Sequence, residues 1–284
     1  MKTKGEKMEV KSLPSFLHKH LSQPQFPGWR ESLIESSIAT LKFYEPQDMP
    51  YWGCFSGGKD SIVIKELAAM AGVNVEWNYS VTTLDPPELT QFIKRYHADV
   101  NRNIPEKTFL QLVPSKGMPT RIMRWCCEKL KESRAPRGRR LILGIRAAES
   151  PRRAKNWQTF TYHRRQREYA VCPILHWLNS DVWSFIIERE LPYCKLYDMG
   201  YERIGCIMCP MAGGKSRLRE SKQYPTMMRQ IKKAAIEYWE KNKRDGKDAR
   251  TYRVFDTGEQ FWEWWLKGDS LPNEECQGEL ELWQ

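Results

Sequence analysis

Short apolar runs alternate with amphipathic stretches along the first two thirds of the chain. Residues 51–55 are apolar and aromatic and are expected to form a buried strand, and residues 73–81 and 140–143 are expected to form two further strands. Apolar residues near helical spacing predict helices over residues 29–45, 62–72 and 181–191, and after Pro87. Strands that alternate with helices predict an α/β fold, in which helices flank a parallel sheet on both faces.

The two ends of the chain have a different pattern. Residues 1–28 are polar and proline-containing, and we expect them to form an arm. From about Ser216 the sequence predicts a long basic helix that breaks near residues 245–246, and then a shorter aromatic helix over 255–269. We therefore expect three parts: the arm 1–28, a central α/β domain 29–215 and a helical extension 216–284.

Composition and charge narrow the function classes. The 284 residues are 40% hydrophobic, which is enough for a sizeable core. The chain has no apolar run of about 18 residues, so no membrane span is expected. Its polar N-terminus predicts a cytoplasmic protein. The net charge of +11 favours a polyanionic partner, such as a nucleotide or nucleic acid, although a basic solvated surface explains the same value.

One loop indicates a specific chemistry. The sequence FSGGKDS spans residues 55–61, between an expected strand and an expected helix. Backbone N–H groups at the start of a helix bind anions. The loop adds two permissive glycines, one cation and two hydroxyl groups: Gly57, Gly58, Lys59, Ser56 and Ser61. It differs from the common G-x-x-x-x-G-K-[ST] loop because an aspartate follows the lysine. A tight turn without a ligand is the alternative.

The SGGKDS loop resembles the PP-loop of the ATP pyrophosphatase superfamily. Within that superfamily, residues 30 to 212 resemble the phosphoadenosine phosphosulfate reductase family. The stretch 172–206 carries a long ordered match that includes Asp-Val-Trp, Leu-Pro and Ile-Gly-Cys. This resemblance implies a Rossmann-like fold of the adenine nucleotide alpha hydrolase type. It also implies ATP cleavage between the α and β phosphates, or an adenylyl sulfate bound in the same place.

The resemblance also implies which residues form the site. GIRAAESPRRAKN (144–156) is similar to the family's arginine segment, in which guanidinium groups face phosphate or sulfate oxygens. TTLDPPEL (82–89) falls where the reductases carry an Asp-Thr-Gly turn, but Pro-Pro replaces Thr-Gly here. Mg²⁺ would be placed by Asp60 or Asp85. The expected catalytic residues are Lys59, Asp60, Arg146, Arg152 and Arg153. The expected nucleotide-binding residues are Ser56, Gly57, Gly58, Lys59, Asp60, Ser61, Thr83, Asp85 and Gly144.

Packing is an expected role for several aromatic and thiol side chains in these segments. We expect Trp177 and Trp183 to lie in the core. Tyr201 and Arg203 either close the nucleotide site or pack against it. The remaining thiols before the C-terminal tail are expected to be buried small hydrophobes: Cys54, Cys172 and Cys194.

Four other cysteines form a recognisable pattern. Cys126 and Cys127 are adjacent, and Cys206 and Cys209 follow much later as a Cys-x-x-Cys pair. This pattern resembles the iron–sulfur branch of the adenylyl sulfate reductases, in which four thiolates hold a 4Fe–4S cluster. Zinc also accepts four thiolates, although adjacent cysteines suit it poorly. Free thiols are the third option.

The expected nucleophile of a reductase is doubtful in this chain. The family places that cysteine in a Glu-Cys-Gly-x-His motif, whereas Cys276 stands in NEECQGELELW. The departure favours an ATP pyrophosphatase that activates an acceptor for sulfur incorporation, similar to the DNA phosphorothioation enzymes. A sulfite-forming reductase and a non-catalytic nucleotide-binding subunit are the alternatives.

The same resemblance suggests partners. Besides the adenine nucleotide, we expect nucleic acid or a sulfur-transfer protein similar to a cysteine desulfurase, and a homo-oligomer is open. Lys and Arg interleave with aromatic residues over 232–244 and 250–255, and this pattern suits a phosphate backbone. An ordinary basic surface helix is the competing interpretation of the same residues.

Overall fold

The computed structural model describes residues 28–132, 135–164, 166–246 and 254–268. These residues form two compact units, and each unit is discontinuous in sequence. The first unit takes its residues from 1–79, 87–102 and 135–204, and the second from 80–86, 103–134 and 205–284. Apart from Gly28, the expected N-terminal arm lies outside the described residues, as does Cys276.

A six-stranded sheet organises the first unit, with the strand order β3-β2-β1-β4-β6-β5. The strands are β1 Tyr51–Cys54, β2 Val75–Ser80, β3 Asn101–Asn103, β4 Leu141–Ile142, β5 Phe160–His163 and β6 Glu168–Val171. β1 pairs in parallel with β2 and β4, and β4 pairs in parallel with β6. β5 runs antiparallel to β6 at the edge. The predicted parallel sheet is confirmed, and the antiparallel edge strand is an addition to it.

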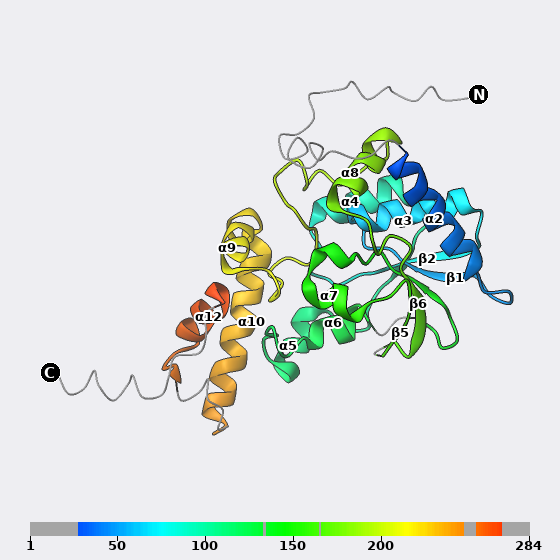
Figure 1. Ribbon diagram of the computed structural model, residues 1–284. Helices are drawn as coiled ribbons and strands as arrows, with labels where there is room; N and C mark the ends of the chain where they lie inside the picture. Colours follow the sequence, from blue (N-terminus) through cyan, green and yellow to red (C-terminus); the bar gives the residue numbers. More distant parts are fainter. Residues whose placement is uncertain (1–27, 133–134, 165, 247–253, 269–284) are drawn as a thin grey trace, which may run out of the picture. The chain divides into compact units, whose positions relative to one another are not determined.

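Helices flank this sheet, and α2, α3, α4 and α8 gather on one face of it (Figure 1). The helical elements of the first unit are α2 Trp29–Phe43, α3 Lys59–Ala71, α4 Pro87–Tyr96, η1 Ala147–Glu149, α7 Pro151–Asn156 and α8 Asn179–Glu188. The helix α3 packs against α2 and α8. It begins at Lys59, three residues earlier than the pattern predicted, so part of the glycine loop forms its first turn.

The core of the first unit contains the side chains that the sequence assigned to it. Trp177 and Trp183 are almost fully buried, and Cys172 and Cys194 are buried completely. Cys54 is only partly buried, because it ends β1 at the edge of a cavity. The expected core position of Cys54 is therefore also a position on a cavity wall.

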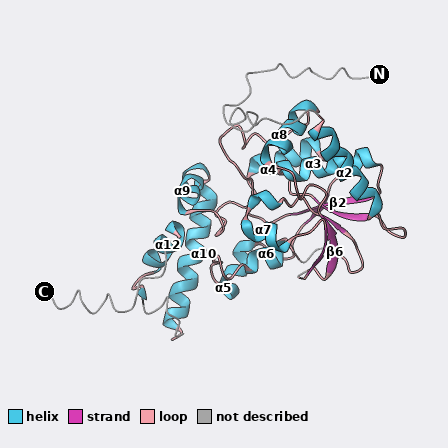
Figure 2. Cartoon of the chain, viewed as in Figure 1, coloured by secondary structure: helices cyan, strands magenta, loops and turns pink. Residues whose placement is uncertain are grey.

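The second unit is helical in the parts that the structure describes (Figure 2). Its helices are α5 Phe109–Lys116, α6 Trp125–Leu130, α9 Gly214–Gln223, α10 Pro225–Arg244 and α12 Gly258–Lys267. The expected long basic helix is thus two helices, which meet at Tyr224 and Pro225. Proline fits the first turn of α10, where its missing N–H has no intrahelical partner. No described helix is both long enough and apolar enough to cross a membrane.

One apolar core joins three separate stretches of the second unit. Leu84, Val113 and Ile207 share this core with Trp239 and Trp265 from the C-terminal helices. The segments that carry the four patterned cysteines are therefore packed with the C-terminal extension. We expected a domain boundary near residue 215, whereas the compact units each combine segments that are distant in sequence.

Candidate active site

The glycine loop after β1 adopts a geometry that few other sequences could adopt. Gly57 has a φ of 70°, and a Cβ atom there would lie 2.6 Å from Cδ1 of Leu89. Gly58 precedes the first turn of α3 in an extended conformation. The Ser61 hydroxyl donates to the Gly58 carbonyl at 2.7 Å and lies 3.2 Å from the Ser56 hydroxyl. Glycine at both positions lets the helix N-terminus face the cavity directly.

Lys59 is a buried cation at the start of α3. Lys59 is 3% exposed, and its Nζ lies 3.3 Å from Oδ2 of Asp60. Burial lowers the pKa of Lys59 below its ordinary value, and the neighbouring Asp60 carboxylate opposes that shift. The Nζ atom also lies 5.9 Å from the centre of the Tyr197 ring. A desolvated ammonium group in this position attracts an anion more strongly than one in water.

Asp60 joins the loop to the segment that follows β4. Nε of Arg146 donates to Oδ1 of Asp60 at 2.6 Å, and Nη2 of Arg146 donates to Oδ1 of Asn179 at 3.3 Å. Arg146 is 3% exposed. A Cβ atom on Gly144 would lie 3.1 Å from the backbone carbonyl of Asp60, so glycine permits this close approach.

Tyr197 was not expected at the site, yet it contacts the loop. Its hydroxyl oxygen accepts a hydrogen bond of 2.9 Å from the backbone N–H of Lys59. Tyr197 is 2% exposed, and burial raises the pKa of its phenol. The Tyr197 hydroxyl therefore accepts a hydrogen bond from an N–H group that a bound anion would use. Tyr197 belongs to the sequence LYDMGY, which was part of the family resemblance. That resemblance was the one sequence signal that could have placed Tyr197 at the site.

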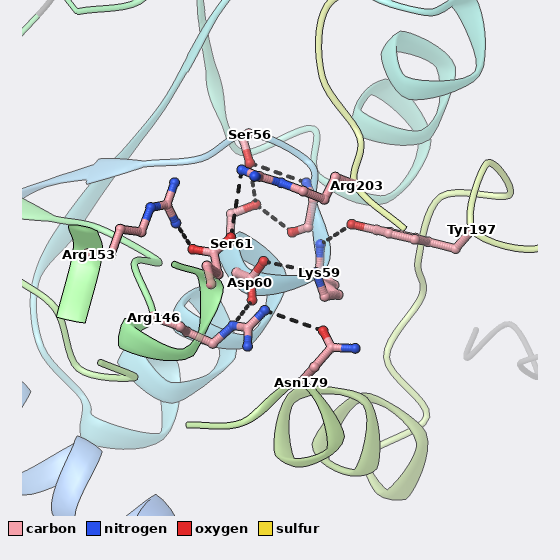
Figure 3. Close-up of polar contacts among 11 residues, drawn as sticks. Ser56, Lys59, Asp60, Ser61, Arg146, Arg153, Asn179, Tyr197 and Arg203 are labelled. Atoms are coloured by element: carbon pink, nitrogen blue, oxygen red, sulfur yellow. Dashed lines mark hydrogen bonds and ion pairs between the residues drawn. The ribbon is translucent and has the colours of Figure 1, made fainter. Parts of the chain in front are cut away.

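Glu149 holds two further arginines near the loop. It forms an ion pair with Arg153, and one of its oxygens lies 3.7 Å from Nη2 of Arg203. Burial lowers the pKa of Arg153, and the positive charge of Arg203 adds to this. Arg152, in contrast, is exposed on α7 and lines neither of the cavities described next. Figure 3 shows Arg146, Arg153 and Arg203 around the loop; the first two come from the segment 144–156, and Arg203 comes from the chain after α8.

Two cavities adjoin the loop in the first unit. One has a volume of about 200 Å³ and is lined by Cys54, Ser56, the residues from Gly58 to Ser61, Gly144 and Arg153. The other has a volume of about 360 Å³ and is lined by Arg146, Asn179, Trp183, Tyr201 and other residues. Lys59, Glu149, Tyr197 and Arg203 line both. The cations Lys59, Arg153 and Arg203 on these walls suit a small anionic ligand.

Thr83 and Asp85 belong to the second unit. Asp85 accepts hydrogen bonds from the backbone N–H and the hydroxyl of Thr82, at 2.7 and 2.8 Å. Thr83 has a φ of 63°, and its hydroxyl oxygen accepts from the Phe109 N–H at 2.9 Å. The TTLDPP segment therefore forms a tight turn that caps the start of α5.

All four patterned cysteines lie in the second unit and interact electrostatically. The hydrogen bond between Cys126 and Cys127 raises the pKa of Cys126 and lowers that of Cys127. Cys206 and Cys209 also raise the pKa of Cys126 by charge repulsion. Within the described ranges, no three His, Cys, Asp or Glu side chains meet closely enough to hold one metal ion. The donor set is nonetheless four thiols, which is the ligand set of a 4Fe–4S cluster.

The loop from Cys206 to Cys209 is anchored from both sides. The backbone N–H of Ile207 donates to the Leu84 carbonyl at 2.8 Å. Met208 has a φ of 59°, and its N–H donates to a carboxylate oxygen of Glu220 at 2.7 Å. Glu220 comes from α9 and is 7% exposed, and burial raises its pKa. Sequence reasoning gave no signal for this contact.

Comparison with known proteins agrees with this architecture. Residues 50–212, more than half of the chain, match the phosphoadenosine phosphosulfate reductase domain. An uncharacterized protein of Methanocaldococcus jannaschii is 34% identical over 214 residues, which are 69% of this chain and 51% of that protein. The chain thus spans about half the length of this curated relative.

A second relative and a solved structure extend the comparison. An adenosine 5'-phosphosulfate reductase of a Geobacillus strain is 26% identical over 204 residues, which cover 66% of this chain and 83% of the reductase. A phosphoadenylyl-sulfate reductase of Candida auris, solved with phosphate, has a TM-score of 0.47 and 15% identity. It covers 65% of this chain and 97% of its own. The family match ends at residue 212, before α9 begins.

Proposed function

Because this chain belongs to the phosphoadenosine phosphosulfate reductase family, we propose that its first unit binds ATP and cleaves it between the α and β phosphates. The products are pyrophosphate and an adenylated acceptor that is ready for sulfur incorporation. The acceptor is proposed to be nucleic acid, because the net charge of +11 favours a polyanion. The proposed compartment is the cytoplasm, where thiols stay reduced.

The observation that carries this proposal is the chemistry of the cavity walls. Among the described residues that line the two cavities, the single thiol is Cys54. Burial raises the pKa of Cys54 to about 12, so this thiol is protonated at neutral pH and a poor nucleophile. The reductase alternative would take its thiolate from Cys276, which lies outside the described residues, whereas adenylyl transfer needs mainly cations and oriented N–H groups. The walls supply the second set.

Each residue of the first unit has a proposed role. The N–H groups of the loop and Lys59 would neutralise the charge that develops on the leaving pyrophosphate. Arg146 and Arg153 would hold α-phosphate or acceptor oxygens by bidentate contacts. Tyr197 would give up its hydrogen bond with the Lys59 N–H when an anion takes its place. Arg152, which is exposed, has no role here.

Three carboxylates line the cavities, namely Asp60, Glu149 and Glu202. Carboxylate oxygens fit the hard oxygen chemistry of Mg²⁺. Asp60 is already paired with Lys59 and Arg146, and Glu149 with Arg153 and Arg203. Bound Mg²⁺ would supply additional charge neutralisation for the phosphates. We propose Asp60 as its ligand, because Asp60 follows the loop directly.

A 4Fe–4S cluster is proposed for the second unit, with Cys126, Cys127, Cys206 and Cys209 as ligands. Four thiols from two segments interact there, and each iron of such a cluster takes one protein thiolate. When bound, the cluster would supply sulfur binding, electron transfer or structural stability. Zinc would require the thiols to converge on one ion.

The deciding experiment uses anaerobically purified full-length protein. ATP and Mg²⁺ are supplied in one reaction, and adenylyl sulfate with reduced thioredoxin in another, and pyrophosphate and sulfite are measured in both. The proposal predicts pyrophosphate from ATP, lost in Lys59→Ala, and no sulfite. Sulfite without pyrophosphate would overturn it and make Cys276 the nucleophile. Nucleotide binding with neither product would indicate a non-catalytic subunit.

A further inference from the structure

The β5–β6 hairpin carries a row of aromatic rings that the proposed chemistry does not use. Tyr162 and Tyr169 are 50% and 51% exposed, and their ring centres lie 5.3 Å apart. Tyr169 stacks on Phe160 at 5.0 Å, and Phe160 stacks on Tyr44 at 4.4 Å. Phe43, 80% exposed, meets Tyr44 edge to face. We call these five side chains the aromatic ladder.

The strand register explains why these rings line up. Phe160 is opposite Val171, and Tyr162 is opposite Tyr169. Directly opposed residues of an antiparallel pair share one face of the sheet. The ladder therefore continues along one face of the edge hairpin to the end of α2. Contiguous exposed apolar side chains of this kind mark an interaction site.

Cationic side chains flank the hairpin end of the ladder, whereas Glu45 and Asp48 line a cavity with Phe43 at its α2 end. The guanidinium group of Arg140 lies 5.4 Å from the centre of the Phe160 ring. Lys42 is exposed next to Phe43, and Arg164 and Arg167 are exposed at the hairpin turn. The nearby carboxylate of Glu168 belongs to the opposite face by register, where it accepts from the Gly138 N–H at 2.6 Å. Exposed rings flanked by cations suit bases joined by phosphates.

The C-terminal helices do not offer the same combination. The sequence suggested nucleic-acid contact over 232–244 and 250–255. Residues 250–253 lie outside the described residues, and Trp239 and Phe255 are buried in the core of the second unit. Tyr238 packs against Gly117. The exposed face of α10 is basic without described aromatic side chains available for stacking. The hairpin therefore has the expected pattern of exposed aromatic rings among basic side chains, and α10 does not.

We infer that the aromatic ladder binds single-stranded nucleic acid. Unpaired bases would stack on Tyr162, Tyr169 and Phe43, while Arg164 and Arg167 neutralise phosphates. A duplex keeps its bases stacked on each other and cannot use these rings. The inference rests on the proposed function, because it assumes that the acceptor is nucleic acid. It adds that the nucleic acid is single-stranded and that the aromatic ladder is the surface that binds it.

The position of the ladder determines what it contributes. Tyr169 lies two residues before the carboxyl end of β6, and the glycine loop follows the carboxyl end of the parallel strand β1. The ladder thus extends away from the edge of the sheet at which the cavities open. It would hold a flanking part of the strand outside the cavities, so its loss would raise KM for the acceptor more than it would lower kcat.

The test is fluorescence anisotropy of the full chain with labelled oligonucleotides, without ATP. The probes are oligo(dT) and oligo(rU) of about 20 nucleotides and a DNA duplex of matched length. The single strands should bind more tightly than the duplex. The double variant Tyr162→Ala/Tyr169→Ala should bind them about 10-fold more weakly or worse, and Tyr162→Phe/Tyr169→Phe should stay within about 2-fold of the wild type. Circular dichroism and a thermal melt establish that both variants are folded.

A charge-matched pair of variants separates this surface from general basicity. Arg164→Ala/Arg167→Ala should reduce the slope of log affinity against log salt by about 1 to 1.5, because two phosphate contacts are lost. Lys241→Ala/Arg244→Ala removes two exposed charges from α10 and should change affinity less. The inference is overturned if the alanine ladder variant binds as the wild type does, if duplex binds equally well, or if the α10 variant alone loses affinity.

These outcomes are independent of the proposed catalysis. Ladder-dependent binding without pyrophosphate release from ATP would support the inferred binding surface and contradict the proposed function. Pyrophosphate release with no ladder-dependent binding would do the reverse.

Discussion

Nε of Arg146 lies 2.6 Å from Oδ1 of Asp60, although 86 residues separate the two in sequence. This contact fixes the segment after β4 against the first turn of α3, and it places a guanidinium group beside Lys59. Both members are needed, since a buried charge without its partner is costly.

Arg146→Ala should therefore damage both stability and turnover. The loss of a partner from a mostly buried ion pair lowers the free energy of unfolding by about 3 kcal/mol, and pyrophosphate release should fall at least about 10-fold. Chemical denaturation and a pyrophosphate assay measure the two effects. Arg152→Ala is the comparison, because this arginine is exposed on α7 and should cost less than about 0.5 kcal/mol. Equal losses in both variants would contradict the assignment.

The backbone of the loop makes a second prediction. Gly57→Ala forces a side chain into a positive φ and brings its Cβ against Leu89, so it should destabilise the fold by about 2–3 kcal/mol. Gly72→Ala is the matched control, since Gly72 has a φ of 69° with no atom within 4 Å of an added Cβ. It should cost about 1 kcal/mol. Similar denaturation midpoints for the two variants would argue against close packing at Gly57.

His97 predicts how stability depends on pH. Burial, together with the charge of Lys65, whose Nζ lies 3.3 Å from Nδ1 of His97, lowers its pKa from 6.5 to about 4. The unfolded chain therefore binds a proton between pH 6.5 and 4 that the folded chain does not. Stability from this residue is constant above about pH 6.5 and declines by about 3 kcal/mol as pH falls to 4.

Denaturant titrations across this pH range, on the wild type and on His97→Gln, measure the effect. The variant should show a flatter decline between pH 6.5 and 4. An unchanged acid profile would mean that other groups cause the loss.

Glu220 predicts that α9 controls the cysteine loop. Glu220→Ala leaves the Met208 N–H without its partner, which costs about 1–3 kcal/mol. Iron and sulfide per chain after anaerobic reconstitution should fall, and Glu220→Gln should restore both, because its amide oxygen still accepts. Glu237→Ala, at an exposed position of α10, is the control. Normal cluster content in Glu220→Ala would remove the anchoring role.

The sequence predicted those parts of the fold that local patterns determine. β1, the glycine loop and α3 are contiguous, so apolar runs, glycines and helical spacing identified them together. The β5–β6 hairpin was missed, because its turn is charged and its strands are short. Tyr197 lies 138 residues from the N–H that it contacts, and no local pattern reports such a distance.

Aromatic residues were the least predictable feature. Trp239 and Tyr169 both stand among basic residues, yet one is buried in a core and the other is half exposed on a hairpin. The difference depends on which face each element turns to its neighbours, which tertiary packing decides. The grouping of Thr83, Asp85 and the cysteines with the C-terminal helices likewise follows from packing across distant segments.

The most direct test of the account is to ask which phosphate bond of ATP is broken. ATP labelled separately in the α and γ phosphates is incubated with anaerobic protein and Mg²⁺, with and without single-stranded nucleic acid, and the products are separated. The account predicts that the γ label appears in pyrophosphate and the α label in AMP or in the adenylated acceptor. Release of the γ label as inorganic phosphate, with ADP as the other product, would contradict it.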